Sequence, residues 1–297
     1  MPGIFFSFYC RLHSEKNYII AAIRYMKKIF EILPSSIDPG NCILICEVSN
    51  EGFSFTIRDE GQNLFMGLGV YHFDKVSLPG DSLEALLQGN EFLSGNFKKV
   101  VLVYSFSESV LIPFPLYDSE QNAEVLNLVH GDMNATDSLL TDVITEESMY
   151  NSFRVPAALY HILQRQFPKA VSQHQYSVLL RQKLPDRNQL SIIFYTGKMV
   201  VSVVKDGKHQ LINSFNYRTE QEVTYILLNI CNQFDIENID VEISGLLEKS
   251  SALYKEIYKY FDTIGLTPLP ENKNYIKEIT EHPAHYFSHI FALDLCE

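Results

Sequence analysis

The chain has 297 residues, of which 46% are hydrophobic and 20% charged, and its formal net charge at pH 7 is −12. This composition is ordinary for a globular protein with a large core and room for two domains. The acidic excess argues against nucleic-acid binding, which requires clustered cations, and no apolar run is long enough for a membrane span. The five cysteines form no CxxC pair, which favours reduced thiols in a cytoplasmic protein.

The N-terminal extension, residues 1–36, precedes the first regular pattern of strands. Residues 1–10 are apolar but lack a basic start and a small-residue cleavage site, so no signal peptide is predicted. The apolar spacing of residues 18–33 predicts an amphipathic helix, which would pack on the first domain or bind a surface. The alternative is that the native protein starts at Met26 and does not include residues 1–25.

Two long segments of the chain repeat one order of elements: three strands, a helix, a fourth strand and a second helix. In the later segment the four strands are expected over residues 190–195, 199–205, 209–217 and 239–245. In the earlier segment they are expected over residues 43–49, 53–61, 64–73 and 99–105. Thr219 and Glu222 form the capping box of the helix between the later strands. The repeat predicts an α/β protein of two similar lobes.

The remaining stretches connect and close these lobes. Prolines in residues 111–118 predict an edge strand or an extended connection. Ser119 is expected to cap a helix through residues 125–129, and the acidic residues 131–148 are expected to form a loop. Helices are predicted over residues 155–167, 171–182 and 282–297. The expected domains are therefore a first lobe (37–153), a helical connection (154–187), a second lobe (188–281) and a C-terminal helix (282–297) that packs back on a lobe.

Four stretches resemble an uncharacterised bacterial family, a domain of unknown function with an actin-like ATPase fold. They are GFSFTIRD (52–59), KVVLVYSFSESVLIPFPLYD (99–118), EISGLLEKSSALYKEIYKYF (242–261) and HPAHYFSHIFALDLC (282–296). The repeated β-β-β-α-β-α order is similar to the two ribonuclease-H-like lobes of actin, hexokinase and Hsp70. The resemblance covers most of the chain from about residue 37 and implies this fold, but it implies no activity.

The fold implies where a nucleotide would bind. Actin-like ATPases hold Mg²⁺ and phosphates with an Asp-x-Gly turn in each lobe, and adenosine with a Gly-Gly pair. The positions that match the first turn supply a carboxylate without a glycine, and those that match the second supply a glycine without a carboxylate. The adenosine element keeps one glycine. The residues that would contact a nucleotide, if one binds, are Glu47, Ser49, Thr196, Gly197, Ser244 and Gly245. Because all three elements are incomplete, we expect no catalytic residue, no cofactor and no ATP hydrolysis, although binding of ATP and Mg²⁺ is an alternative.

Histidines near the C-terminus raise the question of a metal site. His285 and His289 would share one face of a helix, whereas Pro283 places His282 before it. No cysteine or acidic residue accompanies them at a metal-like spacing, so we expect packing or surface histidines and no metal.

Charge is unevenly spread in the middle of the chain. Residues 100–153 contain no Lys or Arg, whereas residues 154–188 are basic. Arg154, Arg165 and Arg181 could bind a small anion in the cleft between the lobes, with His161 and His174 nearby. The alternative is that they neutralise the acidic segment.

The sequence favours a non-enzymatic cytoplasmic protein, a pseudo-ATPase that uses the cleft or an exposed strand edge to bind a protein partner. The alternative is a divergent ATP-binding protein, ATPase or kinase that uses Glu47 in the cleft.

Overall fold

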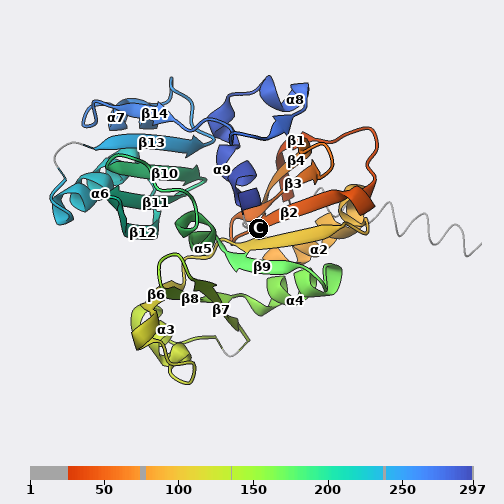
Figure 1. The fold of residues 1–297 in the computed structure, drawn as a ribbon, viewed down its shortest axis with the longest axis horizontal. Helices are drawn as coiled ribbons and strands as arrows, with labels where there is room; N and C mark the ends of the chain where they lie inside the picture. The colour runs from red at the N-terminus through yellow and green to blue at the C-terminus, as the bar shows by residue number, and fades with distance from the viewer. Residues whose placement is uncertain (1–25, 74–77, 135, 237–238, 296–297) are drawn as a thin grey trace, which may run out of the picture. The chain divides into compact units, whose positions relative to one another are not determined.

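The computed structural model describes residues 26–73, 78–134, 136–236 and 239–295 (Figure 1). The chain divides into two compact units. The first contains the described residues up to Val110 together with those of Asp118–Thr141 and Ser152–Gln173. The second contains Leu111–Tyr117, Asp142–Asn151 and the described residues from His174 onward.

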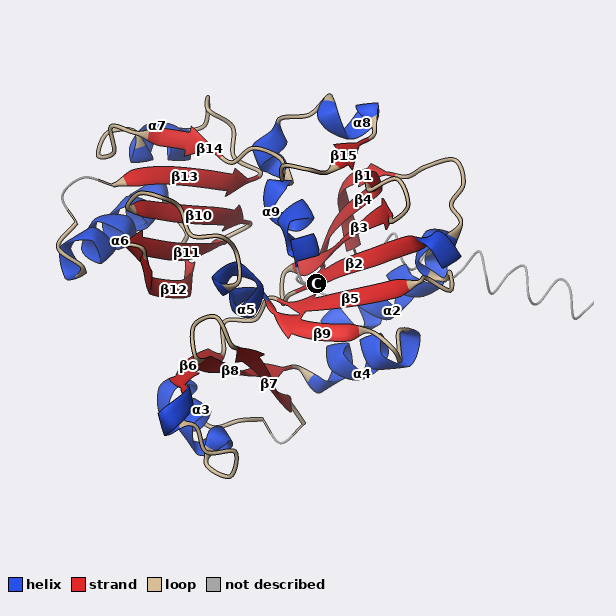
Figure 2. Cartoon of the chain, viewed as in Figure 1, coloured by secondary structure: helices blue, strands red, loops and turns tan. Residues whose placement is uncertain are grey.

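The first unit is built on a mixed sheet (Figure 2). Its strands lie in the order β1 (Met26–Ile32), β4 (Leu64–Phe73), β3 (Gly52–Asp59), β2 (Cys42–Val48), β5 (Lys99–Tyr104) and β9 (Val171–His174). The pairs β1–β4, β4–β3 and β3–β2 are antiparallel, and β2–β5 is parallel. Helices α2 (Pro79–Gly89) and α4 (Ala157–Gln166) pack against each other, and short 3-10 turns cover Pro39–Asn41 (η1) and Glu91–Leu93 (η2).

The second unit has a corresponding sheet. Its strands lie in the order β12 (Lys208–Asn216), β11 (Lys198–Lys205), β10 (Gln189–Tyr195), β13 (Asp240–Gly245) and β14 (Ile264–Leu266). The pairs β12–β11 and β11–β10 are antiparallel, whereas β10–β13 and β13–β14 are parallel. Its helices and turns are α5 (Gln175–Leu180), α6 (Glu220–Gln233), α7 (Ala252–Ile257), α8 (Lys277–Thr280), η4 (Ala284–Tyr286), α9 (Ser288–Phe291) and η5 (Ala292–Leu295). A short strand, β15, covers Asn274–Tyr275.

The two sheets confirm the repeat predicted from the sequence. In each segment the strands lie in the order third, second, first, fourth: β4-β3-β2-β5 in the first unit and β12-β11-β10-β13 in the second. The helix follows the third strand and the parallel fourth strand follows the helix in both segments. The predicted α/β fold of two similar lobes is therefore correct.

Alternating side chains place a core on each face of the second sheet. Leu190 and Ile192 of β10 pack with Leu227 of α6 in one apolar cluster. Ile193, the next residue of β10, packs with Tyr176 of α5 in another. The period of two along a strand accounts for this division. Helix α6 also begins as predicted, with the reciprocal capping box of Thr219 and Glu222.

A three-stranded sheet in the order β6-β8-β7 was not predicted. Its strands are β6 (Ser109–Pro113), β7 (Ser138–Ile144) and β8 (Met149–Val155), and the 3-10 turn η3 (Phe114–Leu116) and helix α3 (Asn122–His130) lie between β6 and β7. The expected loop over residues 131–148 is wrong, because the whole of β7 lies within it. The prediction that Ser119 caps α3 is also wrong. The N-cap residue of α3 is Gln121, whose side chain makes no capping hydrogen bond. The strand β7 was not predicted because its segment is acidic and was interpreted as a solvent-exposed loop, whereas most of its side chains are half-buried.

The ends of the chain also differ from the predictions. Residues 26–32 form strand β1 against β4 and not the end of an amphipathic helix, whereas residues 1–25 lie outside the described residues. The edge of β4 offers backbone partners that the sequence of β1 alone does not reveal. The predicted C-terminal helix is a series of short turns, η4, α9 and η5, that still buries Phe287, Ile290 and Phe291. No helix in the described ranges has the length and apolar character needed to cross a membrane.

Candidate functional site

The first candidate turn connects β2 and β3. Glu47 lies within β2, opposite Ser54 of β3, and its side chain is only 5% exposed. The Ser54 hydroxyl donates a hydrogen bond to Glu47 Oε2 at 3.3 Å. The carboxylate is therefore held inside the sheet, one residue before β2 ends at Val48.

Ser49 organises the turn that follows β2. Its Oγ accepts hydrogen bonds from the backbone N–H groups of Glu51 at 3.1 Å and Gly52 at 3.3 Å. Its own N–H donates to the Gly52 carbonyl at 3.0 Å. A serine hydroxyl that accepts from the amides of its own turn is a common local motif. Two amides that a phosphate-binding turn would direct at its ligand are thus already bonded within the protein.

The second candidate turn connects β10 and β11. Gly197 has a φ of +72°, which favours glycine, and Thr196 and Gly197 are exposed. The Gly197 carbonyl accepts a bond from Tyr217 N at 3.0 Å, and Tyr217 Oη donates to the Tyr195 carbonyl at 3.0 Å. Lys198 is buried, with its ammonium 5.3 Å from the centre of the Tyr195 ring. The turn has the expected glycine and no carboxylate.

The third candidate element is the end of β13. Gly245 has a φ of +99° and lies opposite Phe194 of β10. A Cβ atom at Gly245 would lie 2.1 Å from the Phe194 carbonyl oxygen. Close packing of two strands therefore requires this glycine whether or not a nucleotide binds. Ser244, its neighbour, is buried and lines a pocket of the second unit.

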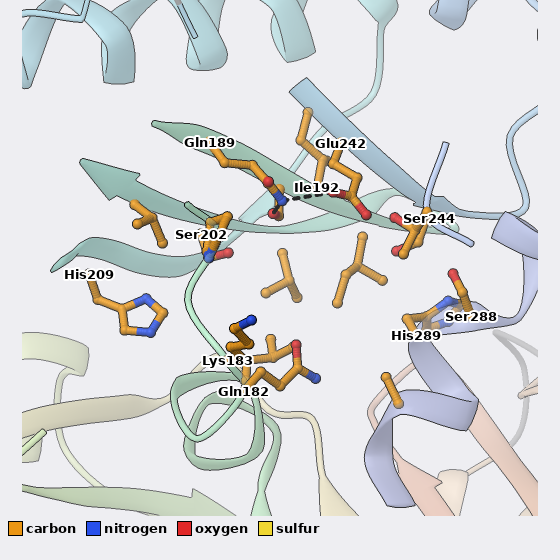
Figure 3. Close-up of a pocket in the computed structure, with 18 residues that line it drawn as sticks. Gln182, Lys183, Gln189, Ile192, Ser202, His209, Glu242, Ser244, Ser288 and His289 are labelled. Carbon is orange, nitrogen blue, oxygen red and sulfur yellow. Dashed lines mark hydrogen bonds between the residues drawn. The ribbon is translucent and has the colours of Figure 1, made fainter. Parts of the chain in front are cut away.

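That pocket contains polar residues that the sequence did not identify as a group. It has a volume of about 310 Å³ and lies over the face of the second sheet that α5 also covers. Figure 3 shows Gln182 and Lys183 on one side of it, and Glu242 and Ser244 on the strands of the other. The sequence did not reveal this group because its side chains come from distant parts of the chain. The serines within the apolar strands β10 and β11 were nevertheless a signal that one face of this sheet carries polar groups.

The three C-terminal histidines do not form a cluster of ligands. His285 Nε2 lies 2.9 Å from the Leu247 carbonyl, and the His289 ring makes an edge contact with Tyr195. Burial lowers the pKa of His289 to about 3, so its imidazole is neutral. In the part of the chain that the structure covers, no three His, Cys, Asp or Glu side chains are grouped as metal ligands.

The three arginines proposed to bind an anion each have partners inside the protein. Arg154 Nη1 lies 2.9 Å from Glu108 Oε2 and 3.0 Å from the Gly131 carbonyl. Arg165 Nη2 lies 2.7 Å from Glu84 Oε1. An anion that binds to Arg154 or Arg165 would have to displace these partners of the guanidinium groups or share the groups with them.

Arg181 likewise donates to the Val143 carbonyl at 2.6 Å, and its Nε lies 3.8 Å from Glu146. Of the two histidines expected near the arginines, His161 is exposed and His174 caps a helix. His161 makes an edge contact with Tyr160, and His174 Nδ1 accepts from Tyr176 N at the start of α5. Arg181 and Glu146 illustrate how the basic segment partly neutralises the acidic one.

A comparison with protein families identifies the chain. Residues 35–264 match the model of a family described as "Protein of unknown function (DUF3822)". The chain belongs to this family. None of the curated proteins compared with it matches.

Solved structures identify the fold of this family member. The chain is similar to a protein of actin-like ATPase fold and unknown function from Bacteroides thetaiotaomicron VPI-5482, with a TM-score of 0.73 and 18% identity over 89% of this chain and 100% of that one. It is also similar to a chain of the PilM-PilN type IV pilus biogenesis complex, with a TM-score of 0.58 and 12% identity over 85% of this chain and 97% of that one. The actin-like ATPase fold expected from the sequence is thereby established for this chain.

Proposed function

We propose that this protein is a non-enzymatic, cytoplasmic member of the actin-like ATPase fold, a pseudo-ATPase that binds another protein. The observation that carries the proposal is that two backbone N–H groups of the β2–β3 turn already donate hydrogen bonds to the Ser49 hydroxyl. Phosphoryl transfer depends on backbone donors and a metal positioned around the phosphates. A turn whose amides already have an acceptor offers a phosphate fewer donors.

The carboxylates support the same proposal. Glu47 is buried between β2 and β3 and accepts from Ser54, and Tyr195 stands where the second Asp-x-Gly turn of an ATPase has its aspartate. Mg²⁺ binds mainly through carboxylates, phosphates and water. The two turns therefore lack an exposed carboxylate at either candidate position, and the buried free thiols of Cys42 and Cys46 fit a reducing compartment.

The edge of the second sheet supports a role in protein binding. Strand β12 ends the strand order of this sheet, and no strand among the described residues pairs with its outer side. Tyr217 N donates to Gly197 O across the β11–β12 pair, so the alternating antiparallel pattern directs the N–H groups of Ser214 and Asn216 away from β11. Asn213 Oδ1 accepts from Ser214 N at 2.8 Å, a bond that an entering strand would replace.

A shallow groove lies beside the C-terminal end of β12. It is lined by Asn216, Tyr217, Arg218, Glu222, Tyr225 and Ile226. Tyr225 is 73% exposed, which is unusual for an aromatic side chain and common at protein interfaces. A strand edge with an adjacent side-chain groove is the arrangement that binds extended peptides by strand addition. We therefore propose as partner an extended segment of another protein, with an aliphatic or aromatic side chain in this groove.

The solved PilM-PilN complex is consistent with this proposal, because it shows a chain of similar fold assembled with another protein. The test is Asn216→Pro, which removes an outward N–H and keeps the β11–β12 ladder, with Asn216→Ala as the matched control. Partners captured from the native cell by the wild-type protein would be purified and titrated against all three forms. We expect Pro to weaken binding at least about tenfold and Ala to have little effect. Equal affinities for Pro and Ala would refute strand addition at β12.

A second candidate function, divergent ATP binding, is favoured by one feature. Gly197 and Gly245 keep the positive φ angles that the nucleotide-binding elements of this fold would need. Direct titration with Mg·ATP separates the two functions.

A further inference from the structure

The pocket of the second unit is built as a binding site, separate from the proposed peptide edge. Its volume of about 310 Å³ lies at the small end of the range for ligand sites. Its floor is the sheet face that carries Ile193 and Val200, and its walls come from α5, the segment after α5, and α9. Figure 3 shows the pocket between strands of the sheet and helical segments, with its polar residues labelled.

Buried polar atoms without hydrogen-bond partners face this pocket from two walls. Gln182 Nε2 and His289 Nδ1 are both buried, and neither has a hydrogen-bond partner among the residues that the structure describes. Such groups are few in folded proteins, and each costs stability unless water or a ligand satisfies it. The pocket therefore offers unused hydrogen-bonding capacity near both of its polar ends.

Charge is distributed between opposite sides of the pocket. Figure 3 shows Lys183 and Gln182 on the side of the segment after α5, and Glu242 across from them on β13. Gln189 Nε2 donates to Glu242 Oε2 at 2.9 Å and to Ser191 Oγ at 2.8 Å, which fixes the carboxylate. Among the ion pairs of the described residues, none joins Lys183 to Glu242. One cation and one anion, separated across an aliphatic floor, match a ligand that carries the opposite charges at its two ends.

We propose that this pocket binds a small zwitterion whose ammonium and carboxylate groups are separated by a short aliphatic chain, as in an ω-amino acid. The ligand ammonium would contact Glu242, with Ser244 and the His289 nitrogen as neighbouring acceptors. The ligand carboxylate would contact Lys183 and the amide of Gln182. The methylene groups would lie on Ile193 and Val200, where their removal from water contributes to binding.

The test is calorimetric titration of the full chain with a homologous series: glycine, β-alanine, γ-aminobutyrate, δ-aminovalerate and ε-aminocaproate. We expect saturable binding with an optimum at one chain length, because Glu242 is held by Gln189 and Lys183 lies on the opposite side of the pocket. Butylamine and butanoate, which each carry only one of the two charges, should bind at least roughly tenfold more weakly than the best zwitterion. The absence of saturable binding by any member, or equal binding of the singly charged analogues, would overturn the proposal.

Variants locate the binding to this pocket. Glu242→Gln keeps the shape of the side chain and its contact with Gln189, and Lys183→Gln removes the cation. Each should weaken the best zwitterion at least roughly tenfold. The matched controls, Glu271→Gln and Lys249→Gln, change exposed residues of the same unit and should leave the affinity unchanged. Unchanged binding by folded Glu242→Gln and Lys183→Gln proteins, with urea midpoints checked first, would assign the ligand to another place and refute the proposal.

Discussion

Gly245 allows a sharp test of whether a residue at a candidate nucleotide position is kept for packing. The perturbation is Gly245→Ala, and the matched control is Gly207→Ala in the β11–β12 turn. Both glycines have positive φ, +99° and +68°, but a Cβ at Gly207 would meet nothing within 4 Å. The two variants therefore share the backbone strain and differ in the steric clash.

The expected magnitudes follow from these geometries. A residue with a Cβ at positive φ costs about 1–2 kcal/mol, which is the full expected cost of Gly207→Ala. At Gly245 the Cβ would also lie 2.1 Å from the Phe194 carbonyl oxygen and 2.9 Å from Phe194 C and N. Because these are backbone atoms, β10 and β13 must separate to make room for the Cβ. Such overpacking costs about 1–3 kcal/mol of unfolding free energy in addition to the cost of the positive φ. We expect Gly245→Ala to lose about 2–5 kcal/mol of unfolding free energy.

The assay is urea unfolding of the two variants and the wild type, without nucleotide, followed by circular dichroism. A Gly245→Ala protein that does not fold at all also agrees with the expectation, provided that Gly207→Ala folds. The reasoning is refuted if Gly245→Ala costs no more than Gly207→Ala.

Three further predictions concern single side chains. Thr219→Ala removes the hydroxyl that accepts from Glu222 N and should cost about 1 kcal/mol of unfolding free energy in urea; no change would contradict the capping role. His289 binds its proton only at about pH 3 when folded but near its usual 6.5 when unfolded, so stability should fall as the pH drops from about 6.5 toward 3. His289→Gln should reduce that slope in a pH series of urea midpoints, and an unchanged slope would contradict the shift. Burial raises the pKa of the Cys46 thiol, so iodoacetamide should label Cys46 only after unfolding, as peptide mass spectrometry would show; labelling of the native protein would contradict its burial.

The hairpins and α6 could be predicted because their signals are local. Asp206 and Gly207 accept the positive φ angles of a tight turn between two alternating strands, and Thr219 with Glu222 marks the start of a helix. Strand β1 could not be predicted in this way. Its apolar residues fit a helical spacing as well as a strand, and only the edge of β4 decides between them.

The candidate site was predictable in position but not in its internal bonding. The order of strands indicated the turns at Ser49 and Gly197, and the structure places each directly after the first strand of its segment. The sequence does not reveal that the Ser49 hydroxyl accepts from two turn amides, because that depends on a side-chain rotamer. The pocket around Glu242 was missed because neighbours in space come from several strands and two helical segments.

The central claim is that the phosphate-binding turns no longer bind a triphosphate, and calorimetric titration of the wild-type protein with Mg·ATP tests it most directly. The account predicts no saturable heat at millimolar ATP, with the same result for Ser49→Ala and Glu47→Gln. Micromolar binding of Mg·ATP that is lost in Glu47→Gln, while the variant stays folded, would contradict it.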